Sequence, residues 1–412
     1  MSIVKPFKAV RPEPKLVDKV AALPYDVMNS EEAREMVKGN PYSFLHVDKA
    51  EIDLDRSIDL YDPKVYEKAA SNLNKMIEDK VLIQDAKPCL YIYRLTMNGR
   101  PQIGIVACAS IDEYLDGKIK KHELTRADKE ADRIRHVDTT NANTGPIFLT
   151  YRANKDLNAI IEKWIAENKV TYDFTADDDV RHEAWVVDCA ESISKIQSLF
   201  EHVEALYIAD GHHRNASAVK VGLMRRDANP SYDKNAEFNF YLSVMFPHDQ
   251  LHIMDYNRIV KDLNGLTDDE FMNGVKSKFN VEPANNGSPK VPHTFGMYIN
   301  NKWYILTAKP EIIINDPIEA LDVSILQKQI LSPLLGIGDP RTDKRIDFIG
   351  GIRGLKELER RVDSGEMKVA FAVFPTSMEQ LLSVADAEKI MPPKSTWFEP
   401  KLRSGMFIHL LD

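Results

Sequence analysis

Residues 204–221 are Glu204-Ala-Leu-Tyr-Ile208, then Ala209-Asp-Gly-His-His-Arg214, then Asn215-Ala-Ser-Ala-Val-Lys-Val221. The apolar run at 204–208 predicts a β-strand, and residues 215–221 predict the beginning of a helix. The polar residues between them therefore occupy a strand-to-helix turn. Gly211 permits a tight turn at this place and the close approach of a ligand.

This turn has the chemistry of an anion-binding site. The first N–H groups of a helix have no acceptor within the helix, and the helix dipole favours negative charge at the same end. Arg214 adds a bidentate donor suited to phosphate, and Gly211, His212 and His213 of the same turn are also predicted to contact the phosphate. The alternative is a polar surface turn, although consecutive His, His and Arg residues have no obvious use in packing there.

The composition is typical of a soluble globular protein. Hydrophobic residues make up 43% and charged residues 28% of the 412 positions, and the net charge is −9. An acidic chain is a poor candidate for non-specific nucleic-acid binding, which depends on a basic surface. The N-terminus lacks the apolar core of a signal peptide, and no apolar run is long enough to cross a bilayer, so we expect a cytoplasmic protein. The three cysteines are widely spaced and indicate neither a disulfide framework nor a zinc site.

Alternating strand and helix patterns predict an α+β, or mixed α/β, fold. Two hairpins are expected, with turns at Met97-Asn-Gly99 and Asn300-Asn301. The predicted helices cover 30–38 with Ser30 as N-cap, 61–79, 156–168, 192–200, 268–279, 323–335 and 378–387. The chain length favours two or three domains. We expect an N-terminal α+β region with a His-Glu cluster at 1–150, a region carrying the turn at 151–285, and a C-terminal α+β region at 286–412.

A second polar cluster lies between Lys120 and Asn143, and His122 and Glu123 stand at its beginning. A glutamate can deprotonate an alcohol that lies within hydrogen-bond reach, so Glu123 is a candidate general base. Glu123 or Asp132 could equally hold Mg²⁺, which prefers one or two carboxylates together with phosphate oxygens. The alternative is an ordinary charged helix.

Two further polar segments, 338–345 and 392–405, contain cations and hydroxyl groups among turn-forming residues. Such loops can cradle a phosphate with N–H groups and cations, and solvated loops are the equal alternative. Near the N-terminus, Pro24-Tyr-Asp-Val27 and Asn40-Pro-Tyr-Ser-Phe44 are explained as well by turn formation as by binding. The chain contains no P-loop, Gly-x-Gly-x-x-Gly or His-Glu-x-x-His motif.

Taken together, several of these motifs resemble the prokaryotic family called domain of unknown function 1015. They extend over nearly the whole chain. The matching motifs are Pro24-Tyr-Asp-Val27, Asn40-Pro-Tyr-Ser-Phe-Leu45, His122-Glu-x-Thr125, Asp132-Arg133, Ala209-Asp-Gly-His-His-Arg214, Asp339-Pro-Arg-x-Asp-x-Arg345 and Pro393-Lys-Ser-Thr-x-Phe-x-Pro-Lys401.

The Asp-Gly-His-His-Arg turn is also similar to the phosphate-binding turn of the ParB/sulfiredoxin-like superfamily. That group includes CTP-binding partition proteins, sulfiredoxin and kinases of free L-serine. The resemblance implies a ParB/sulfiredoxin-like nucleotide-binding core elaborated by additional α+β regions. In the serine kinases a glutamate acts as the base ahead of such a turn, and here Glu123 precedes Asp210–Arg214. Sulfiredoxin chemistry needs a cysteine where this chain has His212, so that activity is not expected.

These resemblances imply an ATP- and Mg²⁺-dependent small-molecule kinase that converts free L-serine to O-phosphoserine. The expected catalytic residues are Glu123, His122, Asp210 and His213, with Asp210 and Glu123 also expected to bind the metal. The expected nucleotide or phosphate contacts are Gly211, His212, His213, Arg214, Lys394, Ser395, Thr396 and Lys401. The expected substrate contacts are Tyr25, Asp26, Thr125, Arg133 and Asn143.

Two alternatives remain open from the sequence. One is a nucleotide-binding switch of the ParB type that acts through a partner. The other is a sugar or polyol kinase, or a phosphohydrolase, using the same site. The expected partners are a nucleotide and a small hydroxylated metabolite such as an amino acid, without nucleic acid or membrane, and a homo-oligomer is left open.

Overall fold

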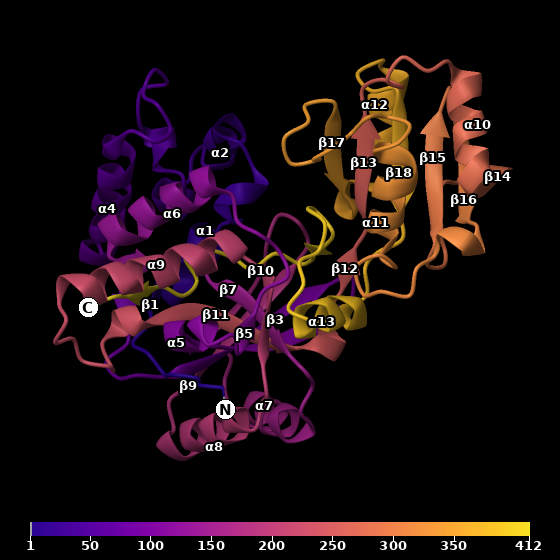
Figure 1. Cartoon of the computed structure of the whole chain (residues 1–412). Helices are drawn as coiled ribbons and strands as arrows, with labels where there is room; N and C mark the ends of the chain where they lie inside the picture. Colours follow the sequence, from indigo (N-terminus) through magenta and orange to yellow (C-terminus); the bar gives the residue numbers. More distant parts are fainter. Residues whose placement is uncertain (1) are drawn as a thin grey trace. The chain divides into compact units, whose positions relative to one another are not determined.

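The computed structural model describes residues 2–412, which form two compact units (Figure 1). The first unit contains the residues up to Lys121, Thr125–Leu251 and Pro400–Asp412, and the second contains His122–Leu124 and His252–Glu399. This division differs from the expected regions 1–150, 151–285 and 286–412. The physical reason is long-range strand pairing: strands from both sides of residue 150 share one sheet, and the C-terminal residues return to the first unit.

An eight-stranded sheet lies at the centre of the first unit, in the order β5-β10-β7-β11-β4-β3-β9-β8. Strand β10 pairs with β5 in parallel and with β7 in antiparallel orientation, so it lies inside the sheet. The strands are β3 (Leu90–Met97), β4 (Arg100–Ser110), β5 (Ile119–Lys120), β7 (Ile147–Tyr151), β8 (Tyr172–Thr175), β9 (Arg181–Val187), β10 (Leu206–Asp210) and β11 (Phe240–Pro247). Two short ladders join β1 (Val10–Pro12) to β2 (Leu82–Gln84) and β6 (Ala142–Asn143) to β20 (His409–Leu410).

The helices of the first unit cover this sheet and build a separate N-terminal layer. They are α1 (Val17–Val20), α2 (Ser30–Met36), α3 (Leu45–Asp48), α4 (Pro63–Glu78), α5 (Ile111–Leu115), α6 (Ala127–Thr140), α7 (Lys155–Glu167), α8 (Ala190–Glu201) and α9 (His212–Ala228). Figure 1 shows α7 and α8 together on one side of the sheet, with α6 and α9 on the other. Among residues 2–412, no helix is both long and apolar enough to cross a membrane.

Burial of apolar strand residues explains why this sheet forms. Every residue of β7 is buried, as expected for a strand covered on both faces. Leu149 belongs to a core cluster that includes Leu157 and Ile161 of α7 and Phe200 of α8. Removal of such side chains from water is the main driving force for this packing.

The second unit is built on a six-stranded sheet in the order β14-β16-β15-β18-β13-β17, in which neighbouring strands are antiparallel. Its strands are β13 (Tyr256–Val260), β14 (Phe279–Ala284), β15 (Thr294–Ile299), β16 (Lys302–Ala308), β17 (Ile346–Gly350) and β18 (Val369–Val373), and β12 (Ile253–Met254) pairs with β19 (Trp397–Phe398). Its helices are α10 (Asp268–Lys278), α11 (Asp322–Leu326), α12 (Gly354–Asp363) and α13 (Met378–Asp386). Leu358 of α12 packs with Ile259 and Ala370 of the sheet.

The α+β prediction is confirmed, and so are both hairpins. Asn98 and Gly99 have positive φ values of 52° and 74°, and Asn300 and Asn301 have values of 51° and 59°. Two adjacent residues with positive φ are what a two-residue hairpin turn requires. The Asn-Gly and Asn-Asn pairs therefore set the registers of β3 with β4 and of β15 with β16.

Two of the helix predictions need correction. The N-cap of α2 is Asn29 rather than Ser30, because the Asn29 side chain accepts from the Glu32 N–H while the Glu32 carboxylate accepts from the Asn29 N–H. The helix expected at 323–335 is α-helical to Leu326 and continues as a π-helix over Gln327–Leu331. Over a few residues the apolar pattern of a π-helical turn is close to that of an α-helix, so the sequence pattern did not distinguish the two kinds of helix.

A buried polar chain ties the C-terminal residues to the sheet of the first unit. The Arg403 Nε donates to the His182 Nε2 at 3.2 Å, and the His182 Nδ1 lies 2.7 Å from the Tyr93 hydroxyl. Arg403 also forms an ion pair with Asp178 at 2.5 Å. Burial, together with the positive charge of Arg403, lowers the pKa of His182 to about 3, so this imidazole is neutral in the folded protein.

This arrangement predicts a loss of stability in acid. The unfolded chain takes up a proton on His182 below its ordinary pKa of 6.5, whereas the folded protein does so only near 3. The free energy of unfolding should therefore fall as the pH drops from 6.5 towards 3, with a slope from this group of at most about 1.4 kcal/mol per pH unit. Urea unfolding at a series of pH values should show a shallower slope for His182→Gln than for the wild type.

The exposed His202 of the same unit provides the control. His202→Gln should leave the pH slope at the wild-type value. An unchanged slope in His182→Gln would show that His182 does not contribute to acid sensitivity.

Candidate functional site

The Asp-Gly-His-His-Arg turn joins the end of β10 to the beginning of α9. Gly211 has a φ of 91° and forms the N-cap of α9, which begins at His212. The left-handed conformation favours glycine because it has no Cβ atom. The helix thus begins three residues earlier than the pattern 215–221 suggested, and His212, His213 and Arg214 lie on its first turn.

Asp210 is ionised and held in place by its neighbours. Its carboxylate accepts from the Lys401 ammonium at 3.1 Å and from the Gly211 N–H at 2.9 Å. Burial alone would raise the pKa of Asp210, but the charges of Lys401 and Arg214 outweigh it and hold this pKa well below its usual range. The structure therefore brings together Lys401 and Asp210, two predicted site residues that are far apart in the sequence.

One nitrogen of Arg214 is anchored by a hydrogen bond, and another is buried without an acceptor among residues 2–412. Its Nη1 donates to the Pro146 carbonyl at 2.6 Å. Its Nε is buried and has no hydrogen-bond partner within residues 2–412. Burial lowers the pKa of Arg214, but the carboxylates of Asp26 and Asp210 outweigh this effect and raise it overall. A buried donor without a partner is costly, so an oxygen-bearing ligand at Nε would be stabilised.

His213 joins the first turn of α9 to the first turn of α6. Its Nε2 accepts from the Arg126 N–H at 3.0 Å, and Arg126 is the N-cap residue of α6. Further along, the Ser217 hydroxyl donates to the Glu130 carbonyl at 3.3 Å, and Arg225 donates to Asn141 at 2.5 Å. The two helices therefore run parallel, and the positive ends of their dipoles lie at the same end of the pair.

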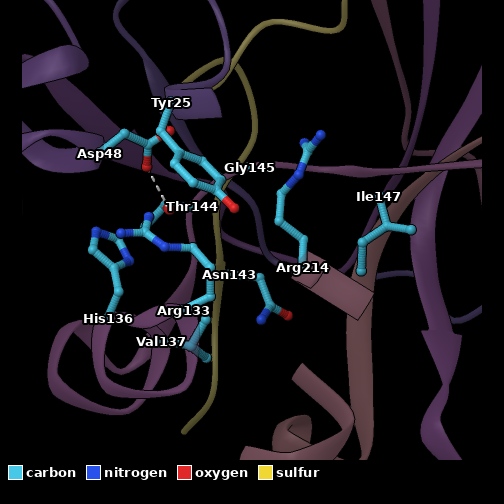
Figure 2. A pocket seen from close by; sticks show the side chains of 10 residues that line it. All are labelled: Tyr25, Asp48, Arg133, His136, Val137, Asn143, Thr144, Gly145, Ile147 and Arg214. Carbon is cyan, nitrogen blue, oxygen red and sulfur yellow. Dashed lines mark hydrogen bonds between the residues drawn. The ribbon is translucent and has the colours of Figure 1, made fainter. Parts of the chain in front are cut away.

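A small pocket adjoins this turn (Figure 2). It is lined by Tyr25, Asp48, Arg133, His136, Val137, Asn143, Thr144, Gly145, Ile147 and Arg214. The cavity volume is about 20 Å³, which is enough for one small polar group. Three of the predicted substrate contacts, Tyr25, Arg133 and Asn143, thus meet Arg214 in one place.

Arg133 is fixed from two sides. Its guanidinium carbon lies 4.1 Å from the centre of the Tyr25 ring, and its Nε donates to the Asp132 carboxylate at 2.9 Å. The Tyr66 hydroxyl donates to the same carboxylate at 2.9 Å. Burial lowers the pKa of Arg133, but the charge of Asp132 more than compensates, so the guanidinium stays charged. This preorganised cation suits a carboxylate or phosphate oxygen.

Asp48, His136 and Thr144 also line the pocket, although they were not among the substrate or phosphate contacts expected from the sequence. The Asp48 carboxylate accepts from the Thr144 hydroxyl at 2.8 Å, and the His136 Nε2 lies 3.1 Å from the Val47 carbonyl. Burial lowers the pKa of His136, and the charge of Arg133 adds to this effect. These residues come from segments far apart in the chain, and the one signal available was that Asp48 closely follows the Asn40–Leu45 motif.

Two predicted substrate contacts do not line this pocket. The Thr125 hydroxyl donates to the Glu130 carboxylate at 2.7 Å, which stabilises the beginning of α6. Asp26 follows Tyr25 and acts on Arg214 through its charge. The Asn143 side-chain oxygen, by contrast, accepts from the Leu242 N–H at 3.2 Å, so it also fixes the scaffold.

The remaining predicted residues belong to the second unit: His122, Glu123, Lys394, Ser395 and Thr396. The structure brings their two segments together. The His122 carbonyl accepts from the Met391 N–H at 2.8 Å, and its Nε2 lies 3.4 Å from the Thr396 hydroxyl. Glu123 is half-buried beside His122.

The carboxylates and imidazoles suggest no metal cage. Within residues 2–412, no group of three or more His, Cys, Asp or Glu side chains is arranged to hold a metal ion. Asp210 does have the chemistry of a Mg²⁺ ligand, because it is an ionised carboxylate at the predicted phosphate turn. Mg²⁺ commonly takes one or two protein carboxylates and completes its shell with phosphate oxygens and water.

Gly211 adopts a left-handed conformation and lies close to the Arg214 side chain. A Cβ atom there would lie 3.2 Å from the Arg214 Nε and would require a residue with φ of 91°. Gly211→Ala should therefore lower the free energy of unfolding by about 1–2 kcal/mol and also weaken ATP binding, as measured by calorimetry, because Arg214 must move.

Gly117 offers a matched control, since its φ is 74° and a Cβ there would meet no atom within 4 Å. Gly117→Ala should show a similar loss of stability with unchanged ATP binding. Equal ATP affinity in the two variants would show that Arg214 is not displaced or does not contact the nucleotide.

Comparison with known proteins gives structural neighbours at low identity. A free serine kinase in complex with AMP is 14% identical, with 74% of this chain and 91% of that chain covered and a TM-score of 0.37. A conserved hypothetical protein from Pyrococcus furiosus is 14% identical, with 74% and 95% covered and a TM-score of 0.36. SbnI from Staphylococcus aureus, with a C-terminal truncation, is 10% identical, with 74% and 87% covered and a TM-score of 0.41.

A search of curated proteins finds no match. The family model described as "Protein of unknown function (DUF1015)" matches residues 4–324, which confirms the resemblance carried by the sequence motifs. The match extends over more than half of the 412 residues. The chain therefore belongs to the DUF1015 family.

Proposed function

We propose that this protein is an ATP-dependent kinase that phosphorylates the hydroxyl group of a free amino acid, with L-serine as the acceptor. The position of Arg214 carries the proposal. Arg214 lies on the first turn of α9, directly after the predicted phosphate turn, and it also lines the pocket that contains three predicted substrate contacts. A kinase needs its phosphate and acceptor subsites to meet at one such point.

The charges in the pocket support a zwitterionic acceptor. Arg133 and Arg214 supply two guanidinium groups, which suit a carboxylate. The Asp48 carboxylate lines the same pocket and is suited to an ammonium group. The cavity of about 20 Å³ is large enough for one small polar group of such an acceptor and too small for a nucleotide.

The turn supports a phosphate subsite beside this pocket. The unpartnered Arg214 Nε and the first N–H groups of α9 are donors for phosphate oxygens. Asp210 is assigned to the metal, and Mg²⁺ bound there would neutralise charge on the phosphoryl oxygens. His212 and His213 are assigned to the phosphate group, together with Gly211 and Lys401.

The proposed reaction is a direct phosphoryl transfer. The serine hydroxyl oxygen forms a bond to the γ-phosphorus of ATP, and the bond from that phosphorus to the bridging oxygen of ADP breaks. Glu123 takes the hydroxyl proton as the general base, with His122 beside it. The products are O-phosphoserine and ADP.

Substitution of the base tests this assignment. Glu123→Gln should retain ATP binding but lose phosphotransfer by about two orders of magnitude or more, whereas Arg214→Ala should weaken both. The measurement is ADP release with ATP, Mg²⁺ and a panel of free amino acids and polyols, with the product identified by mass. Asp128→Asn, at an exposed carboxylate nearby, is the control and should behave as the wild type.

Full phosphotransfer by Glu123→Gln would show that another group is the base. Tight ATP binding by the wild type without acceptor-dependent turnover would favour the nucleotide-binding switch instead. Phosphorylation of polyols but not of amino acids would replace the proposed acceptor class.

The acceptor pocket can be tested separately through Arg133. Arg133→Met should raise the KM for serine by about tenfold or more, because a charge-assisted hydrogen bond is lost, while the KM for ATP stays close to the wild-type value. Arg135→Met removes an exposed arginine from the same helix and serves as the control. Equal serine KM values in both variants would contradict the assignment of Arg133 to the acceptor.

A further inference from the structure

Arg258 is a buried arginine in the second unit. It lies on β13, where it is opposite Phe348 of β17 and Phe371 of β18. Its exposed fraction is 3%, which is unusual for an arginine. The guanidinium carbon lies 5.4 Å from the centre of the Phe348 ring.

Backbone carbonyls, rather than carboxylates, accept the hydrogen bonds of this buried guanidinium. Arg258 forms no ion pair with any residue between 2 and 412, and its hydrogen-bond acceptors are backbone carbonyls. Its Nη1 donates to the Tyr256 carbonyl, and its Nη2 donates to the Lys394 carbonyl at 3.0 Å and contacts the Pro393 carbonyl at 3.5 Å. Burial lowers the pKa of Arg258 to about 10, so it remains protonated at neutral pH. A buried charge without a counter-ion is costly unless another anion approaches it.

The two carbonyls that accept from the Arg258 Nη2 belong to the segment Pro393–Thr396. Lys394 has a φ of 57°, an uncommon conformation for a residue with a side chain. The Ser395 carbonyl accepts from the Thr376 hydroxyl at 2.9 Å, and the Ser395 hydroxyl donates to the Pro392 carbonyl at 2.6 Å. Hydrogen bonds from Thr376 and from the positively charged Arg258 therefore fix the backbone of this segment on its buried side.

The exposed side of this segment presents a second positive charge. The Lys394 side chain is exposed, and its ammonium nitrogen lies 5.6 Å from the centre of the Tyr256 ring. The Thr396 hydroxyl lies next to the buried His122. The Lys394 ammonium and the Thr396 hydroxyl on this segment, with the Arg258 guanidinium behind it, make a favourable environment for an anion with several oxygens.

We propose that Arg258 is a positioning residue that fixes the segment Pro393–Thr396 as a phosphate-binding element of the second unit. Arg258 holds the backbone of this segment and adds a positive field behind it, while Lys394 and Thr396 touch the anion. This inference deepens the proposed function by adding Lys394 and Thr396, which the sequence resemblance also implies as phosphate contacts, and it rests on that function for the identity of the natural ligand.

Inorganic pyrophosphate is the probe, since its binding requires neither turnover nor an acceptor. Calorimetry on the full chain should show that Lys394→Ala and Arg258→Gln each weaken pyrophosphate binding by about tenfold. Arg258→Lys, which keeps the charge, should retain part of this affinity. Arg353→Gln removes an exposed arginine of the same unit and should bind as the wild type.

A double variant, Arg258→Gln with Lys394→Ala, distinguishes an effect of Arg258 on the position of Lys394 from a general loss of stability. If Arg258 acts through the segment that carries Lys394, then Arg258→Gln should have little further effect in the Lys394→Ala background. Additive losses, or unchanged binding in both single variants, would overturn the proposal. Lys394→Ala changes an exposed side chain, so it remains a valid test if Arg258→Gln does not fold.

These outcomes are independent of the kinase reaction. If pyrophosphate binding depends on Lys394 but the protein transfers no phosphate, the proposed anion-binding segment stands and the kinase proposal is wrong. If the protein transfers phosphate but neither Lys394→Ala nor Arg258→Gln changes pyrophosphate binding, the proposed anion-binding segment is wrong and the kinase proposal stands.

Discussion

The ion pair between Lys401 and Asp210 connects the C-terminal segment to the turn that precedes α9. The two residues are 191 positions apart and their charged atoms lie 3.1 Å from each other. Removal of either partner would leave a poorly solvated charge behind, which is far more costly than the net gain from the intact pair. The pair therefore holds Pro400–Asp412 against the first unit and keeps Asp210 ionised beside the first turn of α9.

Neighbouring contacts strengthen the same connection. Arg403 binds Asp178 and His182, Ser404 pairs with the backbone of Ala22, and β20 pairs with β6. Because β6 contains Asn143, which lines the pocket, the return of the C-terminal residues also fixes one wall of that pocket. Stability and site geometry depend here on the same long-range contacts.

The groups that surround the buried arginines differ between the two units. In the first unit, Arg133 has Asp132 as its partner, and the charge of Arg214 is offset by several nearby carboxylates. In the second unit, Arg258 has carbonyls and an aromatic ring around it. Guanidinium groups that lie beside carboxylates suit a zwitterionic ligand, which carries a positive and a negative charge. A guanidinium group that lies among carbonyls favours an anion.

The sequence by itself determined the local structure where one residue type has a strong conformational preference. Asn-Gly at 98–99 specified a hairpin, Gly211 specified a left-handed turn before a helix, and alternating apolar residues specified an α+β fold. Tyr25, Arg133, Asn143 and Arg214 were also expected from the sequence as substrate or phosphate contacts, and all four line the pocket.

Only the tertiary structure decided which segments share a sheet and which polar groups share a pocket. Pairing of β10 with β5 and β7, and the return of the chain at Pro400, are set by long-range packing that no local pattern encodes. Asp48, His136 and Arg258 carry no motif that distinguishes them from ordinary polar residues. Their significance comes from burial beside particular partners, which depends on the complete fold.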